Sequence, residues 1–239
     1  MADLKSTAFE QLHIDAGARM VEFGGWNMPV QYDGIIAEHN HTREQVSLFD
    51  CSHMGQFRVK GPNAGTELDA ILPRCAANQK HGSCRYNFIL NESGGVLDDL
   101  IVYRLNDDEF YIVVNAGTCE GDAAWFKQHL KTAEFIDESA STSKLDIQGP
   151  ETMAVMKELG FDTELLPGYF KFIETELDGM PLLLSRTGYT GELGFELYFH
   201  SDQSEAVWAK IMGCSHVKPA GLGARDTLRL EMGYPLYGH

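Results

Sequence analysis

Two stretches of the chain share one pattern of hydrophobic and polar positions. Residues 57–60 alternate apolar and basic side chains, as a half-buried strand does, and a Gly-Pro pair then leads into residues 66–72, where apolar side chains recur at helical spacing. Residues 145–148 repeat the alternation, and a second Gly-Pro pair leads into residues 153–159, which again have helical spacing. Each stretch therefore predicts a strand, a tight turn and an amphipathic helix.

Three strand-like segments follow each predicted helix. They lie at residues 86–90, 100–105 and 110–114 in the first copy, and at residues 170–177, 182–185 and 195–199 in the second. Each set ends in a predicted helix that carries a tryptophan, Trp125 in the first copy and Trp208 in the second. Asp202 and Glu205 have the spacing of a capping box and predict where the second of these helices begins.

The repeat predicts an α+β fold. Two β-α-β-β-β-α units of similar length indicate a duplicated sandwich of ferredoxin-like units, each an antiparallel sheet covered on one face by helices. We expect one unit over residues 52–140 and the other over residues 1–51 together with 141–239. Chance recurrence of common elements is the alternative, but the shared Gly-Pro and tryptophan positions favour duplication. Ligand sites in such proteins tend to lie between the units.

Composition restricts the partners. The chain has 239 residues, 44% of them hydrophobic, with 19 Lys and Arg against 35 Asp and Glu and a formal net charge of −16. A field of this sign repels polyphosphate, and the arginines occur singly, so neither nucleic acid nor an anionic membrane is an expected partner. Isolated arginines suit a small anion better.

Cysteine usage and the N-terminal residues bear on the compartment. The five cysteines are widely spaced and contain no C-x-x-C pair, which predicts neither a disulfide framework nor a zinc site. No metal site is expected elsewhere, because the isolated histidines have no further ligands at recognisable spacing. The first ten residues lack the apolar core of a leader, and no apolar run is long enough to cross a bilayer. These features predict a cytoplasmic protein.

Tandem aspartates stand at the start of a predicted strand. Successive strand residues point to opposite faces, so Asp98 and Asp99 cannot both address one site. Asp99 shares its face with Ile101 and Tyr103, and a carboxylate beside an aromatic ring suits a flat heterocycle with N–H donors. The alternative is a turn acid followed by an exposed acid at a strand edge.

Two glycine-containing segments are further candidates. Residues 186–197 hold three glycines within seven residues around Tyr189, which lets the backbone approach a ligand closely, and Glu196 follows on the strand face opposite the core residues. Residues 221–226 form a glycine turn that opens a helix, with Arg225 in its first turn as a candidate carboxylate site. A solvated outer glutamate and an arginine paired with nearby acids are the alternatives. The third glycine of a dinucleotide fingerprint is absent.

Five motifs carry a resemblance to a known family. They are G-G-W-N-M-P at residues 24–29, F-D-C-S-H-M-G at 49–55, G-G-V-L-D-D at 94–99, S-R-T-G-Y-T-G-E at 185–192 and G-L-G-A-R-D at 221–226. In this order, and from about Phe9 to the last residue, the chain resembles the aminomethyltransferases of the glycine cleavage system, the T-proteins.

The resemblance implies a tetrahydrofolate enzyme that takes an aminomethyl group from the lipoyl arm of the H-protein, releases ammonia and forms 5,10-methylenetetrahydrofolate. By similarity, Asp99 is the catalytic carboxylate, which binds the pterin-side nitrogens and orients or activates folate for attack. Tyr103 shares its strand face. The other positions at which the family lines its folate pocket are Tyr86, Asn115, Tyr169, Tyr189, Glu196 and Arg225.

The chain differs from the family in length, and other functions of the same fold remain as alternatives. Family members continue beyond the motif at residues 236–239 into a C-terminal β-barrel domain that adds another arginine to the folate site. We therefore expect this chain to fold, to bind folate weakly and to show weak turnover or none. Relatives of the same fold are tetrahydrofolate-dependent demethylases, and others are non-catalytic folate-binding factors in iron–sulfur assembly. The K-G-C-Y-x-G-Q-E motif of the latter branch does not occur in the sequence.

Overall fold

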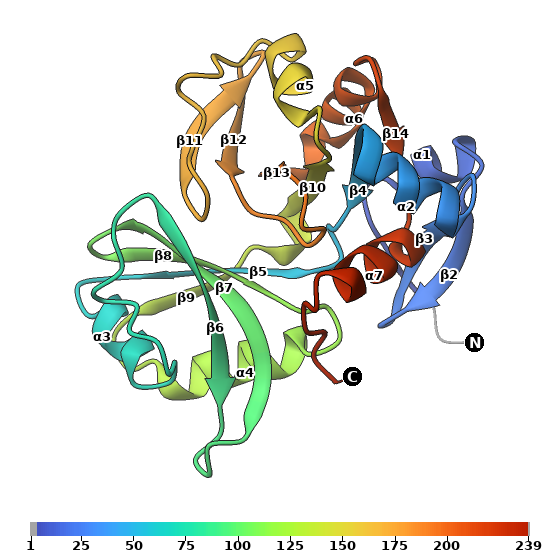
Figure 1. Ribbon diagram of the computed structural model, residues 1–239. Helices are drawn as coiled ribbons and strands as arrows, with labels where there is room; N and C mark the ends of the chain where they lie inside the picture. Colours follow the sequence, from blue (N-terminus) through green and yellow to red (C-terminus); the bar gives the residue numbers. More distant parts are fainter. Residues whose placement is uncertain (1–3, 239) are drawn as a thin grey trace.

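The computed structural model describes residues 4–238 and contains both copies of the repeat (Figure 1). The first copy comprises β5 (Gly55–Lys60), α3 (Ala64–Asp69), β6 (Ser83–Leu90), β7 (Val96–Asn106), β8 (Glu109–Val114), α4 (Cys119–His129) and β9 (Glu134–Asp137). The second comprises β10 (Thr142–Gln148), α5 (Thr152–Glu158), β11 (Phe172–Leu177), β12 (Met180–Ser185), β13 (Gly194–His200), α6 (Ser204–Met212) and β14 (Val217–Pro219).

The two large sheets have the same strand order, except that the second contains one additional strand. The first has the order β6-β7-β8-β5-β9 and the second the order β11-β12-β13-β10-β4-β14. The predicted duplication is therefore confirmed, and each copy ends in one more strand than the β-α-β-β-β-α pattern contains. The sheets differ at one place, where β4 (Val46–Asp50) is inserted beside β10 in the second sheet.

The N-terminal part of the chain supplies that extra strand. Before β4 it forms β1 (Lys5–Ser6), α1 (Glu10–Asp15), β2 (Arg19–Phe23), β3 (Trp26–Gln31) and α2 (Ile35–Glu44), with the three strands in a separate sheet of order β1-β3-β2. The last helix, α7 (Leu222–Glu231), follows β14 and packs against α2 and β3. Within residues 4–238, no helix is long and apolar enough to span a membrane.

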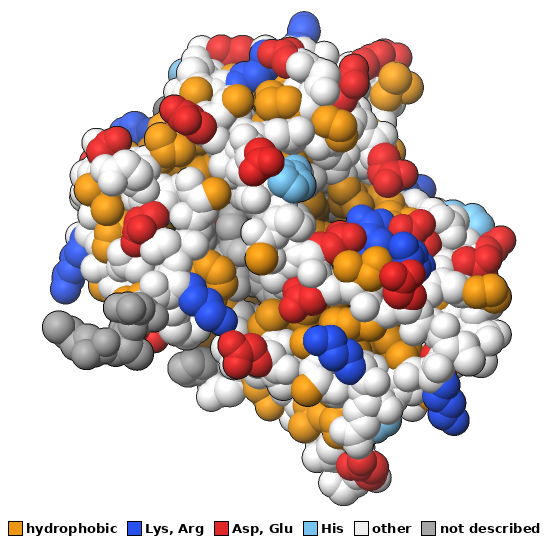
Figure 2. All heavy atoms as spheres, turned by 180° about the vertical axis from the view of Figure 1, so that it is seen from behind, with side chains coloured by type: hydrophobic (Ala, Val, Ile, Leu, Met, Phe, Trp, Pro, Cys, Tyr) orange, Lys and Arg blue, Asp and Glu red, His pale blue; other side chains and the backbone are white. Residues whose placement is uncertain are grey.

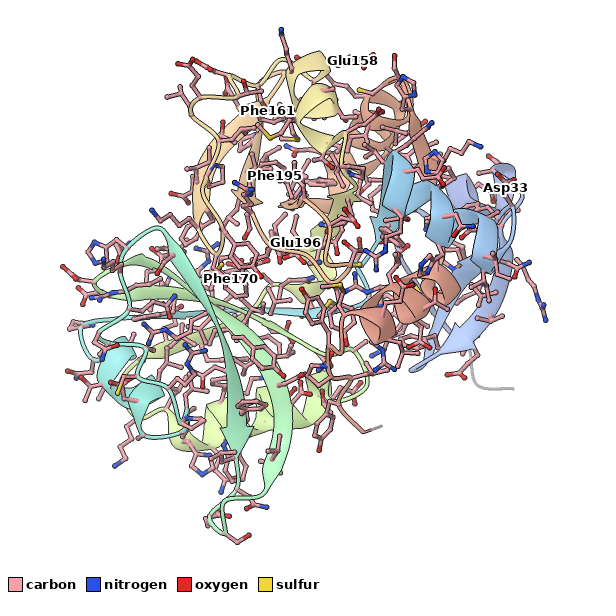
Figure 3. All side chains as sticks on the ribbon, viewed as in Figure 1. Asp33, Glu158, Phe161, Phe170, Phe195 and Glu196 are labelled. Carbon is pink, nitrogen blue, oxygen red and sulfur yellow. The ribbon has the colours of Figure 1, made fainter. Side chains whose placement is uncertain are left out.

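Each large sheet has one apolar face under its helices and an inner face turned toward the other sheet. Phe126 of α4 packs against the first sheet, and Trp208 of α6 packs against the second. The inner faces meet at an aromatic cluster that joins Tyr103 and Tyr111 to Tyr198. Figure 3 shows the alternation on β13, where Phe195 points into the helix-covered core and its neighbour Glu196 points toward the space between the sheets.

One local prediction was wrong. A short 3-10 helix, η2 (Ser201–Gln203), precedes α6, so Asp202 lies in that turn and forms no capping box. The Asp202 amide instead donates to Nδ1 of His200 at 3.3 Å. The Ser204 hydroxyl, at the first residue of α6, lies 2.7 Å from that of Ser143. The start of α6 is therefore accompanied by a contact with Ser143 of β10. That strand is distant in the sequence, so the residues around the helix could not predict the contact.

Candidate active site

A carboxylate with two hydrogen-bond donors stands on the inner face of the first sheet. Asp99 lies on β7, and its Oδ2 accepts from the Tyr86 hydroxyl of β6 at 2.6 Å. Its Oδ1 accepts from Nδ2 of Asn115, just beyond β8, at 2.5 Å. All three side chains are half-buried, so the carboxylate is oriented by the protein and remains accessible. Burial is the largest cause that raises the pKa of Tyr86, and the neighbouring Asp99 carboxylate raises it further. The Tyr86 hydroxyl therefore keeps its proton and remains a donor.

The neighbouring aspartate points the other way, as the strand period predicts. Asp98 is completely buried on the helix-covered side, together with Leu100 and Val102. It accepts from the backbone N–H of Asn115 at 3.1 Å and from Asn115 Nδ2 at 2.8 Å. The prediction that the two acids face opposite sides is confirmed. Asn115 contacts both carboxylates because it lies at the end of the adjacent strand.

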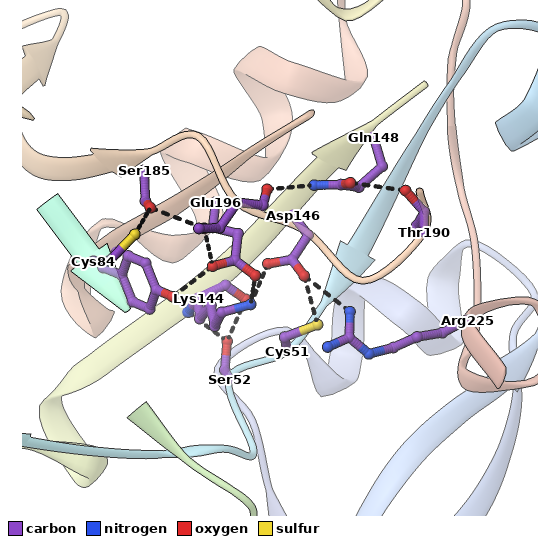
Figure 4. Close-up of polar contacts among 12 residues, drawn as sticks. Cys51, Ser52, Cys84, Lys144, Asp146, Gln148, Ser185, Thr190, Glu196 and Arg225 are labelled. Atoms are coloured by element: carbon purple, nitrogen blue, oxygen red, sulfur yellow. Dashed lines mark hydrogen bonds and ion pairs between the residues drawn. The ribbon is translucent and has the colours of Figure 1, made fainter. Parts of the chain in front are cut away.

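A buried network of charges lies on the inner face of the second sheet (Figure 4). Lys144, 1% exposed, donates to Asp146 on its own strand, β10, and to Oε1 of Glu196 on β13 at 2.9 Å. Arg225, at the start of α7, donates to the other oxygen of Asp146 at 2.9 Å. Two cations thus face two anions, and the buried group is electrically balanced.

Glu196 is held in its ionised form. Its Oε2 accepts from Thr187 at 2.5 Å, from Tyr198 at 2.8 Å and from Tyr103 at 3.3 Å. Burial alone would raise the pKa of Glu196, but the Lys144 ammonium and these hydroxyl donors outweigh it and lower the pKa to about 2.

Tyr189 lies on the loop between β12 and β13 and contacts Arg225 and Tyr234. Its ring lies 4.9 Å from the guanidinium carbon of Arg225, a cation–π contact, and it stacks on Tyr234 at 5.9 Å. Burial raises the pKa of the Tyr189 hydroxyl, and the charges that act on it include Arg225 and Asp99. Its hydroxyl donates to the carbonyl of Pro235, where the chain after α7 passes over the loop.

Two glycines of this loop allow Gln148 to pack against it. A Cβ at Gly188 or Gly194 would meet the Gln148 amide, which donates to the carbonyl of Thr187 at 3.1 Å and accepts from the Thr190 hydroxyl at 2.9 Å. Only the glycine at position 191 has a positive φ, of 83°. The expected tight turn is therefore present, and two of its three glycines make room for a side chain of the protein itself.

The structure brings most of the predicted site residues together, in different roles. Asp99, Tyr86, Asn115 and Tyr189 are partly exposed around the space between the sheets, and Arg225 is 14% exposed at its side. Tyr103 is completely buried, and its hydroxyl contacts Glu196 and Tyr198, so Tyr103 joins the inner faces of the two sheets. Tyr169 is 70% exposed on the loop before β11, where its ring lies edge to face on that of Phe170.

The sequence reading overlooked Lys144 and Asp146. Both lie on β10, the strand that was recognised by its alternation, and the apolar residues Leu145 and Ile147 point to the opposite, helix-covered side. Lys144, Asp146 and Gln148 occupy alternate positions on the inward face of the strand. This run of polar residues was the signal that could have revealed Lys144 and Asp146. Among residues 4–238, no group of three or more His, Cys, Asp or Glu side chains is arranged to hold a metal ion.

The sequence of this chain matches a known protein family. A family model described as the GCVT N-terminal domain matches residues 9–239. The chain belongs to this family. The protein named "Aminomethyltransferase" from Chlorobium luteolum is 43% identical over 244 residues, which cover 99% of this chain and 67% of the relative. That from Moorella thermoacetica is also 43% identical and covers 100% of this chain and 67% of its own length.

Solved structures agree on the fold. The crystal structure titled glycine cleavage system aminomethyltransferase T from Bartonella henselae superposes with a TM-score of 0.92 at 39% identity, covering 98% of this chain and 64% of that chain. A heterotetrameric sarcosine oxidase from Corynebacterium sp. U-96 has the same fold at a TM-score of 0.53 and 19% identity. The chain thus spans about two thirds of the length of the aminomethyltransferases that it matches. The resemblance to the aminomethyltransferase family and the duplicated α+β fold are confirmed.

Proposed function

We propose that this chain binds tetrahydrofolate and forms the folate-binding part of an aminomethyltransferase of the glycine cleavage system. The donor is the aminomethyl group on the lipoyl arm of the H-protein, and the products are ammonia and 5,10-methylenetetrahydrofolate. The observation that carries the proposal is the half-exposed Asp99 carboxylate, held between Tyr86 and Asn115 at 2.6 and 2.5 Å on the face where the two units meet.

The residues at this place fit a reduced pterin. Each Asp99 oxygen accepts one side-chain hydrogen bond from the protein and keeps acceptor capacity for a further donor, as the N–H groups at the edge of a pterin require. The Tyr86 ring supplies aromatic surface beside Asp99, and the Arg225 guanidinium lies against the Tyr189 ring.

Tetrahydrofolate supplies the amine that accepts the one-carbon unit. The role we assign to Asp99 is to accept hydrogen bonds from the pterin-side N–H groups and to orient the acceptor nitrogen, with its negative charge stabilising positive charge at the reacting centre. Tyr86 and Asn115 restrict the Asp99 rotamer. The Tyr103 hydroxyl donates to Glu196, which also pairs with Lys144, and this contact joins the two sheets. By the family resemblance, we assign Tyr169 and Arg225 to the folate site as well.

Binding of tetrahydrofolate to the chain tests this proposal. We expect saturable binding by calorimetry and an affinity lowered about tenfold in Asp99→Asn, because the neutral amide loses a charged acceptor. Asp108→Asn changes an exposed aspartate in the turn between β7 and β8 and is the matched control. Equal affinity of the native chain and Asp99→Asn would refute the assignment of Asp99.

A turnover assay tests the reaction. The chain is incubated with tetrahydrofolate and aminomethyl-loaded H-protein, and ammonia and methylenetetrahydrofolate are measured. Product from the native chain that is lost in Asp99→Asn supports the proposal. Methyl transfer from a methylated donor without ammonia release would instead support the tetrahydrofolate-dependent demethylases of this fold.

The cysteines support the compartment that we assign to the reaction. All five are free in the structure: Cys51, Cys75, Cys84, Cys119 and Cys214. Unpaired cysteines are usual in a reducing environment, so we place the protein in the cytoplasm.

A further inference from the structure

Arg43, in the last turn of α2, bonds to two segments that are far from it in the sequence. Its Nη1 donates to the carbonyl of Thr190 at 2.6 Å and to Oε1 of Glu192 at 2.9 Å, in the loop between β12 and β13. Its Nη2 and Nε donate to Oε2 of Glu231 at 2.8 and 3.0 Å, and Nη2 donates to the carbonyl of Leu228 at 3.3 Å, at the end of α7. One guanidinium therefore ties the loop and α7 together from α2, which packs against α7 (Figure 1).

The shape of the arginine side chain makes this bridge possible. A guanidinium is planar and carries five N–H groups that point in fixed directions, so it serves acceptors on two sides. The Arg43 side chain is 21% exposed and that of Glu192 is half-buried, whereas Glu231 is exposed and its ion pair contributes less. The Thr190 carbonyl and the Glu192 carboxylate are thus the contacts that hold the loop.

The two segments that Arg43 joins each carry one partner of a cation–π contact. Tyr189 directly precedes Thr190 in the loop, and Arg225 lies on α7, one turn before Leu228. The Tyr189 ring lies 4.9 Å from the guanidinium carbon of Arg225. In the described part of the chain, the Arg43 side chain bonds to groups beside this pair and not to the pair itself. Any effect of Arg43 on the contact is therefore exerted through the backbone of the loop and of α7.

We propose that Arg43 is a positioning residue that sets the Tyr189 ring against the Arg225 guanidinium by fixing the loop on α7. Tyr189 and Arg225 belong to the folate site under the function proposed above, so the consequence of Arg43 for tetrahydrofolate rests on that function. The placement of the ring on the guanidinium does not rest on it.

Arg43→Lys keeps the charge and removes the fork. An ammonium presents its donors from a single atom at the end of a flexible stem, so it cannot serve the Thr190 carbonyl and Glu231 in the same geometry. We expect the loop to shift relative to α7 and the contact between Tyr189 and Arg225 to be weakened.

The side-chain Nε–H signal of Arg225 in an NMR spectrum reports the contact directly, because the ring current of Tyr189 displaces it. The signal is identified by its loss in Arg225→Lys, and Tyr189→Leu gives its position without the ring. The spectra are recorded without tetrahydrofolate. In Arg43→Lys we expect the signal to move from the native position toward that of Tyr189→Leu.

Arg58→Lys is the matched control. Arg58 on β5 forms a similar fork, with Nε and Nη2 donating to Glu138 at 2.6 and 3.1 Å and Nη1 donating to Glu109 at 2.7 Å, and its side chain is 27% exposed. Neither carboxylate lies in the loop or on α7. This variant should lose similar stability in urea unfolding and leave the Arg225 signal at its native position.

Three results decide the matter. A signal that stays at the native position in Arg43→Lys would overturn the proposal, as would an equal displacement in Arg58→Lys, because that would reflect a general loosening of the fold. Should Arg43→Lys not fold, Glu192→Ala takes its place, since it removes one bond on the loop side only. It should displace the signal in the same direction, and an unmoved signal there overturns the proposal.

Tetrahydrofolate binding separates this inference from the proposed function. We expect the affinity of Arg43→Lys to lie about tenfold below that of the native chain, and little further loss when Arg43→Lys is added to Tyr189→Leu, since both changes act through the same ring. Additive losses would contradict an action through Tyr189. If the Arg225 signal moves as described but tetrahydrofolate does not bind to the native chain, the proposed function fails and the positioning role of Arg43 stands.

Discussion

Lys144→Met removes the central cation of the buried network without removing its volume. Lys144 is 1% exposed and donates to Asp146 and to Glu196, the latter at 2.9 Å. Asp146 retains its bond from Arg225, but Glu196 loses its only ion pair among the described residues. Removing one partner of a buried ion pair typically costs about 3–5 kcal/mol, since the remaining charge is left uncompensated. A methionine recovers part of that cost through apolar burial, so we expect a loss of about 3 kcal/mol.

The loss is measured by urea unfolding followed by circular dichroism and by calorimetry. For a chain of this size, about 3 kcal/mol corresponds to a fall in Tm of about 6–12 °C. Adding Glu196→Gln should recover part of the loss, because the amide buries no net charge. Lys5→Met is the control, since the Lys5–Glu120 pair is 59% and 88% exposed and contributes little.

The loss of stability in Lys144→Met should depend on pH. The pKa of Glu196 is lowered to about 2 in the native chain, so its stabilising contribution is complete above its ordinary value of 4.5 and is lost as the pH falls toward 2. Without the Lys144 ammonium, burial raises the pKa of Glu196. The variant then loses stability only at pH values where Glu196 is ionised in the unfolded chain. The difference in stability between native and variant chains should be largest near pH 7 and narrow below about 4.5. A difference that is small at pH 7, or equal at pH 4 and 7, would refute this reasoning.

Two further substitutions test the site and the fold. Tyr86→Phe removes the 2.6 Å hydrogen bond to Asp99 and should weaken tetrahydrofolate binding about tenfold by calorimetry, with Tm nearly unchanged; unaltered affinity would argue against an oriented Asp99. Gly149→Ala should destabilise by about 3 kcal/mol or more, because its Cβ would collide with the backbone carbonyl of Gln45 at a φ of 147°. Gly160→Ala, at a φ of 92° with open space around it, should cost only about 1 kcal/mol by urea unfolding, and equal losses at both glycines would contradict the steric argument.

Positive charge is scattered over the surface seen in Figure 2 and is paired in the interior. Figure 2 shows that acidic side chains are spread over the face seen from behind, with lysines and arginines interspersed among them. The formal net charge of −16 is therefore not offset there by a continuous basic patch. The two buried cations, Lys144 and Arg225, are instead matched by Asp146 and Glu196 in the interior.

The sequence by itself determined the repeat and the faces of its strands. A period of two assigns alternate residues to opposite sides without knowledge of the partner strands, so it correctly separated Asp98 from Asp99. The same period, with the shared turns, predicted two matching sheets. The family motifs predicted residues for the candidate site at positions that are far apart in the chain.

Only the tertiary structure decided which charges meet. Lys144 and Glu196 are 52 positions apart, and Arg225 is 79 positions from Asp146, so no local window contains these pairs. The insertion of β4 beside β10 likewise depends on long-range strand pairing. Periodicity determines the direction of a side chain, whereas the identity of its neighbour depends on how the sheets and helices pack.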